Sequence, residues 1–236
     1  MINEVLLMAS IVVLYGAVVF IYKVFDKEGL FAWMALATVI ANIEVLRVVD
    51  AFGIEQTLGN VLFASTFLAT QILNENEGQK TARKAAWLGI TAGLAFAVIS
   101  QSWLLYEPSG SDWAGDAFDT IFSITPRIVG VSVIVYAICQ HLDVWLFARI
   151  RKLTEKRYGD SGKHLWFRNN VATLITQIVN TVLYNLGAFA GIYSWHTLLS
   201  ICVGSYLVFI VTSLCDTPAL YLCRRLKNGN RSEFRV

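Results

Sequence analysis

The most constraining feature of this sequence is the segment from Leu165 to Tyr193, which is long and apolar enough to cross a bilayer yet carries a row of polar side chains. The polar residues recur at spacings of three, four, three and four positions, which places them on one face of a helix. They are Asn170, Thr173, Gln177, Asn180 and Tyr184. Because an unpartnered amide is costly in hydrocarbon, this face must turn toward other helices or a water-filled cavity. The chain is therefore expected to be an integral membrane protein with a polar interior.

The composition agrees with a membrane protein. Hydrophobic residues make up 56% of the 236 residues and charged residues only 15%, whereas about a quarter of a soluble domain is charged. The apolar residues gather in runs of roughly 20, the length of a membrane-spanning helix. We predict an all-α integral membrane protein with about seven transmembrane helices. The predicted spans are Val5–Tyr22, Leu30–Val49, Leu58–Leu73, Ala85–Leu105, Phe118–Phe147, Val171–Ile192 and Thr197–Cys223.

Positive charge is distributed unevenly along the chain. Nearly all Lys and Arg residues lie in alternate connections between the predicted spans and in the C-terminal tail, whereas the loop after the fourth span carries Glu107, Asp112 and Asp116. Cytoplasmic loops of membrane proteins are enriched in Lys and Arg. We therefore predict a multi-pass protein of the cell inner (plasma) membrane, with its N-terminus outside and its C-terminus in the cytoplasm.

Several functional classes lack their motifs in this sequence. There is no Walker-type or G-x-G-x-x-G pattern, and no H-E-x-x-H or G-x-S-x-G motif of hydrolytic enzymes. The four Cys residues do not have metal-ligand spacing, and no Lys lies deep in a span, where a retinal Schiff base would need one. We predict that the chain is not an enzyme, binds no metal or cofactor and has no nucleic-acid partner.

The third predicted span ends in a polar face. Gln71, Asn74 and Glu75 lie on one side of a helix near its cytoplasmic end, before Gly78 ends that helix. Such a face is either part of a ligand site or the amphipathic exit of a helix into water. All three residues are candidate substrate-binding residues, and both interpretations remain open for Glu75.

The fifth predicted span begins with Pro126 and Arg127 and later carries Gln140 and Asp143. Proline interrupts the hydrogen-bond ladder of a helix, and the adjacent guanidinium offers five donors, so the two residues predict a polar pocket near the outer half. Alternatively, Arg127 extends to the outer head groups. Gln140 and Asp143 share a face of the helix, and Asp143 is alternatively a counter-ion of the arginines that follow the span.

Four motifs occur in a fixed order along the chain: FLATQILNENEG, TPRI at 125–128, YAICQHLDVWLF at 136–147, and LWFRNN followed by Q and NT between 165 and 181. Together they resemble the queuosine-precursor transporter family, also called the vitamin-uptake transporter family, over residues 30–225. The resemblance implies import of 7-deazaguanine bases and related queuosine precursors. It also implies a six-helix core similar to the substrate-binding components of energy-coupling-factor transporters.

The resemblance divides the chain into three parts. Residues 1–29 are expected to form a peripheral N-terminal transmembrane helix and the first cytoplasmic turn, residues 30–225 the six-helix transporter core, and residues 226–236 a cytoplasmic tail. In the family an Asp usually stands at the positions of Gln71 and Asn180, and a Lys near Phe209. This chain has neutral residues at all three positions, as expected for a coupled replacement that leaves no charge unpaired.

The residues themselves also favour a purine-like ligand. A purine-like base is flat, neutral and rich in alternating donors and acceptors, which Asn and Gln amides match without charge and which aromatic rings can stack on. We predict a transporter of such a base or nucleoside in the lipid bilayer; a homodimer is left open. Two alternatives remain, a substrate-binding membrane subunit that works with a separate ATP-driven module, and amides that serve only helix–helix hydrogen bonding. The candidate substrate-binding residues are Gln71, Asn74, Glu75, Arg127, Gln140, Asp143, Asn170, Gln177, Asn180 and Tyr184.

Overall fold

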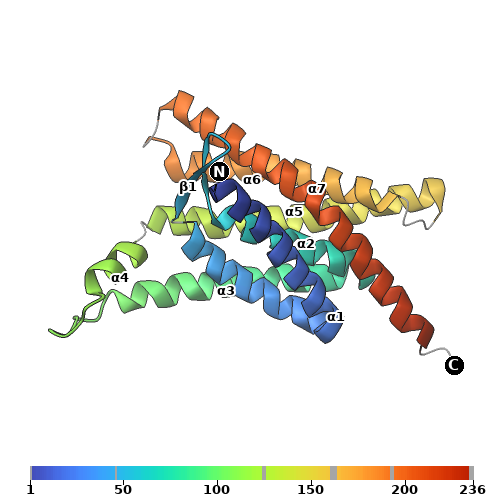
Figure 1. The fold of residues 1–236 in the computed structure, drawn as a ribbon, viewed down its shortest axis with the longest axis horizontal. Helices are drawn as coiled ribbons and strands as arrows, with labels where there is room; N and C mark the ends of the chain where they lie inside the picture. Colours follow the sequence, from blue (N-terminus) through green and yellow to red (C-terminus); the bar gives the residue numbers. More distant parts are fainter. Residues whose placement is uncertain (1, 46, 124–125, 160–163, 192–193, 234–236) are drawn as a thin grey trace.

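The computed structural model describes residues 2–45, 47–123, 126–159, 164–191 and 194–233, with the backbone only at positions 48, 54–57, 126–129, 197 and 228–233. Within these residues the chain forms helices and one two-stranded hairpin (Figure 1). The elements are α1 (Ile2–Glu44), β1 (Val48–Ala51), β2 (Ile54–Thr57), α2 (Gly59–Asn76), α3 (Gln79–Trp103), α4 (Gly115–Phe122), α5 (Pro126–Tyr158), α6 (Leu165–Phe189) and α7 (Trp195–Glu233).

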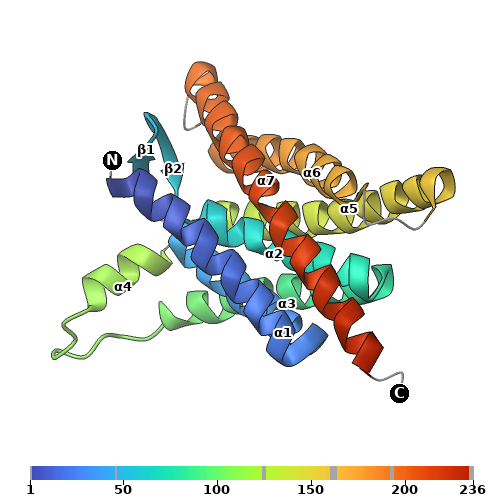
Figure 2. The same ribbon diagram turned by 45° about the vertical axis from the view of Figure 1, so that its right-hand side comes forward.

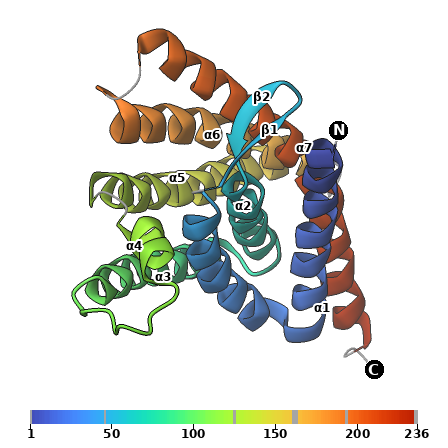
Figure 3. The same cartoon turned by 60° about the vertical axis from the view of Figure 1, so that its left-hand side comes forward.

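Helix α1 consists of two arms. Asp26 has φ 53° and ψ −142°, which is not helical, and the chain turns back on itself there, so that the arms form a V (Figure 3). The first arm packs inward along one stripe of buried residues, which are Leu7, Ile11, Tyr15, Val18 and Tyr22. Its other face is exposed and apolar. The arms correspond to the first two predicted spans.

Helix α2 lies at the centre of the molecule. Of its 18 residues, the 15 buried ones include every position from Ala64 to Glu75. It packs against α1, α3, α5 and α7, and Figure 2 shows it behind α1 and α7. Because its neighbours cover it on all sides, α2 can carry polar residues that a lipid-facing helix could not.

Among the described residues, five helical segments are long and apolar enough to cross a membrane: Ile2–Glu44, Gln79–Trp103, Gly130–Tyr158, Leu165–Phe189 and Leu198–Lys227. The exposed large side chains along these helices are mostly Val, Leu, Ile, Phe and Trp, as expected of surfaces that contact lipid. The predicted multi-pass, mainly helical membrane protein is therefore confirmed. The central helix α2 is not among the five segments.

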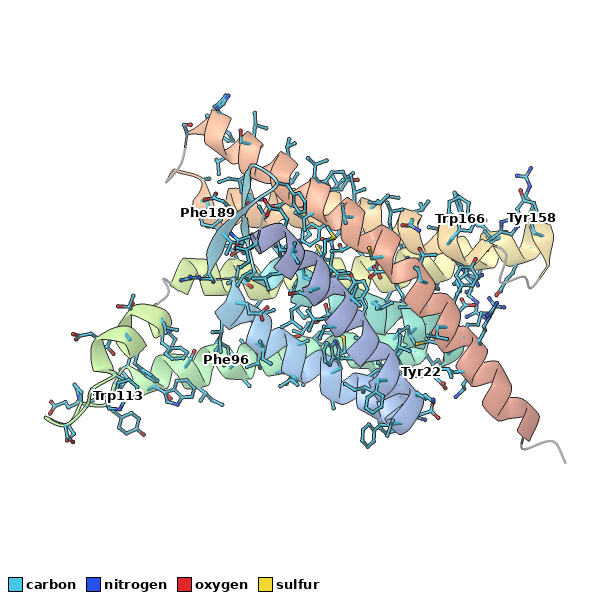
Figure 4. The ribbon with its side chains drawn as sticks, in the orientation of Figure 1. Tyr22, Phe96, Trp113, Tyr158, Trp166 and Phe189 are labelled. Atoms are coloured by element: carbon cyan, nitrogen blue, oxygen red, sulfur yellow. The ribbon has the colours of Figure 1, made fainter. Side chains whose placement is uncertain are left out.

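The molecule has two chemically different ends. One end holds the turn at Asp26, the α2–α3 turn and the C-terminus, and we call it the basic end because most Lys and Arg residues belong to these segments. The other, the hairpin end, holds β1, β2 and α4 with its acidic residues. Aromatic side chains lie toward both ends, with Tyr22, Tyr158 and Trp166 toward the basic end and Trp113 and Phe189 toward the hairpin end (Figure 4). Such belts are typical of the two membrane–water interfaces.

The hairpin was not predicted from the sequence. The second predicted span extends to Val49, but the helix ends at Glu44 and the next residues pair as antiparallel strands. Phe52 and Gly53 form the two-residue turn with φ of 56° and 72°. The hairpin is tied to the start of α1, because Asn3 Nδ2 donates to the Asp50 carbonyl at 2.8 Å.

Two other boundaries differ from the prediction. The predicted span Phe118–Phe147 is wrong at its start, because residues up to Phe122 belong to α4 and α5 begins at Pro126. Proline therefore stands at the first helical position, where its missing N–H costs nothing, rather than opening a helix from within. The C-terminal helix α7 also continues through Pro218 to Glu233, beyond the predicted end of the last span at Cys223.

A close helix contact gives a testable prediction at Gly59. A Cβ added there would lie 2.9 Å from the Ala41 carbonyl oxygen and 3.0 Å from the Val45 amide nitrogen, both backbone atoms that cannot turn aside. We expect Gly59→Ala to reduce the free energy of unfolding by about 1–3 kcal/mol through overpacking. The matched control is Gly130→Ala, where nothing lies within 4 Å and alanine is expected to be neutral or stabilising. Denaturant titration of the purified protein in detergent measures both, and equal effects would contradict the prediction.

Candidate functional site

Side chains from three helices meet at Gln71. Its Nε2 donates to Asp143 Oδ1 and Oδ2 at 3.2 and 3.1 Å and to Thr173 Oγ1 at 2.5 Å. Gln71 lies on α2, Asp143 on α5 and Thr173 on α6, and all three are buried. The alternative for Asp143, a shallow counter-ion of the arginines that follow, is wrong, because the carboxylate is fully buried and accepts hydrogen bonds from an amide.

Gln140 and Asn74 join α2 to α5. Gln140 Nε2 donates to Thr66 Oγ1 at 2.8 Å, and Thr70 Oγ1 donates to Gln140 Oε1 at 3.3 Å. Asn74 Nδ2 donates to the carbonyl of Val144 at 2.9 Å. Both amides are therefore partnered by the neighbouring helix.

The polar face predicted on α6 turns inward. Asn170, Thr173, Gln177 and Asn180 are at most 8% exposed, and Tyr184 is half-buried. The large residues on the opposite face of α6 are apolar and exposed. The prediction that this face lines a polar interior of the molecule is confirmed.

The amides of this face differ in their hydrogen bonding. Asn170 is fully paired, because its Nδ2 donates to the Trp166 carbonyl at 2.8 Å and to Thr217 Oγ1 at 2.9 Å, and its Oδ1 accepts from Ser213 Oγ at 3.0 Å. Asn180 Nδ2 donates to Gln177 Oε1 at 3.1 Å. Asn170 thus ties α6 to α7, whereas the Nε2 of Gln177 is buried without a hydrogen-bond partner among the described residues.

Further polar atoms near Gln177 are buried without hydrogen bonds in the described part of the chain. They are Gln71 Oε1, Thr176 Oγ1 and Thr181 Oγ1. Thr173, which bonds Gln71, lies one turn of α6 from Gln177, a rise of about 6 Å. The open acceptor of Gln71 therefore belongs to a side chain that contacts α6 one turn away from Gln177. Each buried polar group without a hydrogen bond costs about 1–3 kcal/mol of folding free energy. Such groups therefore often bind a water molecule or a ligand.

An aromatic cluster adjoins these amides. The ring of Phe63 lies 5.2 Å from that of Phe67, 5.5 Å from Tyr136 and 6.4 Å from Phe209, measured between centroids. Tyr184 packs against the buried apolar group of Phe67, Val135 and Cys139, in which Cys139 is the sequence neighbour of Gln140. Of the five aromatic residues, only Tyr184 was among the predicted substrate-binding residues. For Phe63 and Phe67 the sequence did offer a signal, because their spacing of four positions places both rings on one face of the third predicted span.

Glu75 is the centre of a cluster of charges toward the basic end. Its Oε1 accepts from Arg168 Nη2 and from Arg224 Nη1, each at 2.6 Å, and its Oε2 lies 3.7 Å from Arg151 Nη1. The Arg168 and Glu75 side chains are 1% and 2% exposed. Arg151 Nη1 also donates to the Glu75 carbonyl at 2.7 Å, and its Nε to Glu155. We call Glu75, Arg151, Arg168 and Arg224 the charged cluster. It joins α2, α5, α6 and α7 and pairs Glu75 with three arginines, although Glu75 Oε2 has no hydrogen-bond partner among the described residues.

A second ion-pair group extends this network to the turn of α1. Lys227 Nζ lies 2.5 Å from Glu77 Oε1 and 3.6 Å from Asp26 Oδ1. The C-terminal part of α7 is thereby linked to the end of α2 and to the V of α1.

Asp216 was missed as a candidate residue. It lies within α7 and is 1% exposed. The Tyr15 hydroxyl from α1 lies against its carboxylate, and Asn169 on α6 faces the same turn of α7, with Nδ2 directed at Ser213 and Thr217. An acidic residue inside a predicted apolar span was the signal that the sequence offered.

The remaining candidate, Arg127, lies in the first turn of α5, and its side chain is outside the described residues. Its predicted role in a polar pocket stays a prediction.

An apolar groove of about 230 Å³ lies away from the amides, between α1, the hairpin, α2 and α7. It is lined by Leu7, Met8, Ile11, Ala51, Phe52, Val61, Leu207, Val208 and Val211. These side chains offer no hydrogen-bonding partner to a polar base, so the groove does not suit the predicted ligand.

Comparison with known proteins agrees with the motifs. The family model described as "Putative vitamin uptake transporter" matches residues 57–223. A curated protein of Bacillus subtilis (strain 168), named "Probable queuosine precursor transporter", is 38% identical over 216 residues, covering 91% of this chain and 92% of the relative. No solved structure matches the chain. The matched region begins just before α2, so α1 lies outside the family model. The chain therefore belongs to the vitamin uptake transporter family, a family of membrane transporters.

Proposed function

We propose that this protein imports a queuosine precursor or a related 7-deazaguanine or purine-like base. The observation that carries the proposal is the pair of open amide atoms, Gln177 Nε2 and Gln71 Oε1, which are buried without partners in the described part of the chain. A donor and an acceptor are the two kinds of group that the edge of a planar heterocycle needs opposite its own acceptors and donors. The name of the 38% identical relative supports the same substrate class.

The aromatic cluster supplies the second element of such a site. Tyr184 and Phe67 lie beside the amides and offer ring faces on which a flat base can stack. An inorganic ion has no flat face that could stack on these rings. The combination of open amides and adjacent rings therefore favours a base over an ion as the main ligand.

The proposed topology has seven spans. Each arm of α1 forms one span, α2 forms a central span shielded by its neighbours, and α3, α5, α6 and α7 form the rest. The N-terminal arm is then an addition to a six-helix core of the type found in substrate-binding components of energy-coupling-factor transporters. The basic end faces the cytoplasm of a cell whose inner membrane holds the protein, because Lys and Arg gather there.

Binding and transport can be tested separately. Thermal-shift measurements on the purified protein with guanine, 7-deazaguanines, queuine and queuosine identify the ligand, since specific binding raises stability. Uptake of the same compound into proteoliposomes that contain only this chain tests transport. Binding without uptake would favour the alternative, a subunit that depends on a separate ATP-driven module. No stabilisation by any compound would contradict the proposal.

Gln177→Ala is the variant that tests the amide site. We expect ligand affinity to fall by about five- to 150-fold, because a buried hydrogen bond worth about 1–3 kcal/mol is lost. The control is Asn185→Ala on the same helix, whose Nδ2 is already satisfied by the Thr181 carbonyl at 2.9 Å. Isothermal titration should show nearly unchanged affinity for the control. Equal affinity in both variants would place the site elsewhere.

A further inference from the structure

One exposed face of α5 changes its chemistry along the helix. Ile134, Ile138, Trp145, Arg149 and Lys152 lie on this face, because their spacings of four, seven, four and three positions follow the helical repeat. All five side chains are exposed, and the guanidinium of Arg149 lies over the ring of Trp145, 5.5 Å from its centroid. Toward the basic end the face thus passes from aliphatic residues to a tryptophan and then to cations. This order matches the layers of one bilayer leaflet, from acyl chains through the interface to the head groups.

The neighbouring helix α3 has the same order of residues. It runs in the opposite direction to α5 (Figure 1), so its first residues lie toward the basic end. Lys80 and Arg83 are followed on one face by Trp87 and then by Leu94 and Val98, and all five side chains are exposed. Two adjacent helices therefore present cations, a tryptophan and aliphatic residues in the same layers.

A ring contact joins the two faces. The indole of Trp87 on α3 meets the imidazole of His141 on α5 edge to face, with 5.0 Å between the ring centroids. From this contact, Lys80 lies about 11 Å toward the basic end along α3, and Arg149 lies about 12 Å in the same direction along α5. The cations of both helices therefore lie at nearly the same depth. We call the following residues the basic–aromatic surface: Lys80, Arg83, Trp87, Trp145, Arg149 and Lys152.

The positive charge of this surface is not neutralised by the protein. In the part of the chain that the structure describes, none of its four cations forms an ion pair. Helix α3 contains no Asp or Glu, and α5 contains two acidic residues that are engaged elsewhere. Asp143 is buried and accepts from Gln71. Glu155 accepts from Arg151, which belongs to the charged cluster. The surface therefore suits an anion at the membrane boundary.

We propose that the basic–aromatic surface binds the head group of an anionic phospholipid. The cations of both helices bind its phosphate, and the two tryptophans lie at the level of its glycerol and ester groups. Its acyl chains run along the exposed aliphatic residues of α3 and α5. A free phosphate ion would use the same cations, but it has no apolar part that could contact the tryptophans and the aliphatic residues. The bound lipid links α3 to α5 whichever base is transported.

The test compares two phospholipids with the same acyl chains. Dioleoyl phosphatidylglycerol is anionic, whereas dioleoyl phosphatidylcholine has no net charge. Native mass spectrometry of the full-length protein in detergent measures the dissociation constant of the first lipid that binds. We expect the wild-type protein to bind phosphatidylglycerol roughly tenfold more tightly or better. Arg83→Gln combined with Arg149→Gln should reduce this preference to below about threefold, because it removes one cation from each helix.

The matched control is Lys23→Gln combined with Arg225→Gln, which removes two exposed cations from α1 and α7 toward the same end of the molecule. This variant should keep the full preference for phosphatidylglycerol. An equal loss in both double variants would assign the preference to net charge and overturn the proposed site. Inorganic phosphate, added at matched ionic strength, should leave the affinity for the lipid unchanged. Displacement of the lipid by inorganic phosphate would assign the cations to a free anion and overturn the lipid as the ligand.

Discussion

Glu75→Gln is expected to destabilise the protein by about 3–5 kcal/mol, which is among the largest effects of any single substitution here. The carboxylate accepts from Arg168 and Arg224 at 2.6 Å each and lies 3.7 Å from Arg151. Glutamine keeps the shape of the side chain but removes the charge, so the almost fully buried guanidinium of Arg168 loses its counter-ion. A buried charge that has lost its partner costs far more than the original pair contributed.

The measurement is the free energy of unfolding in a mild detergent titrated with SDS. Glu155→Gln is the matched control, because Glu155 pairs with Arg151 at 2.6 Å but is 32% exposed, and its loss should cost less than about 1 kcal/mol. The double variant Glu75→Gln with Arg168→Gln should recover part of the lost stability, since it removes the orphaned charge. A single-variant loss no larger than that of the control would show that the charged cluster is not a stabilising element.

Gln71→Glu is expected to make stability depend strongly on pH. The introduced carboxylate would take the place of an amide that lies 3.1 and 3.2 Å from the oxygens of Asp143. Two carboxylates at that distance are tolerated when they share a proton and repel each other when both are ionised. The variant should therefore be folded and most stable near pH 5, and its free energy of unfolding should fall by up to about 1.4 kcal/mol per pH unit as the proton is lost.

The comparison is with the wild-type protein over the same pH range, so that any titration of Asp143 itself is subtracted. Gln79→Glu is the control, because it introduces the same charge at the first residue of α3, where a carboxylate is favourable. A pH profile parallel to that of the wild type would mean that the side chain at position 71 does not face Asp143 in solution.

The inward face of α6 could be predicted from the sequence because its signal is local. Polar residues at helical spacing inside an apolar segment have one low-energy arrangement, with the amides inside and the Leu, Val and Ile side chains toward lipid. The partners of these amides could not be predicted in the same way. Whether Asn170 contacts Thr217 or a ligand depends on how α7 packs, and nothing in the local pattern encodes that.

The role of Glu75 could not be predicted from the sequence for the same reason. Its position at the end of a polar helical face was visible in the sequence, and two interpretations remained open. The deciding partners, Arg168 and Arg224, lie 93 and 149 positions away in the chain. Three positive charges reach it only after α5, α6 and α7 have packed around α2. Asp216 was missed for a related reason, because Asn169 on α6 faces its turn of α7 only after the two helices have packed.

The central position of α2 has a consequence for how the protein is made. A helix that enters the bilayer alone must present an apolar surface to the translocon and to lipid, and α2, with Gln71, Asn74 and Glu75 on its surface, is not among the segments apolar enough to do so. It can remain in the membrane only when neighbouring helices already cover it. Biosynthesis must therefore hold α2 beside α1 until α5 and α7, which lie far downstream in the chain, have been synthesised. A ribosome stalled before α5 would leave a nascent chain that membrane quality-control proteases can recognise.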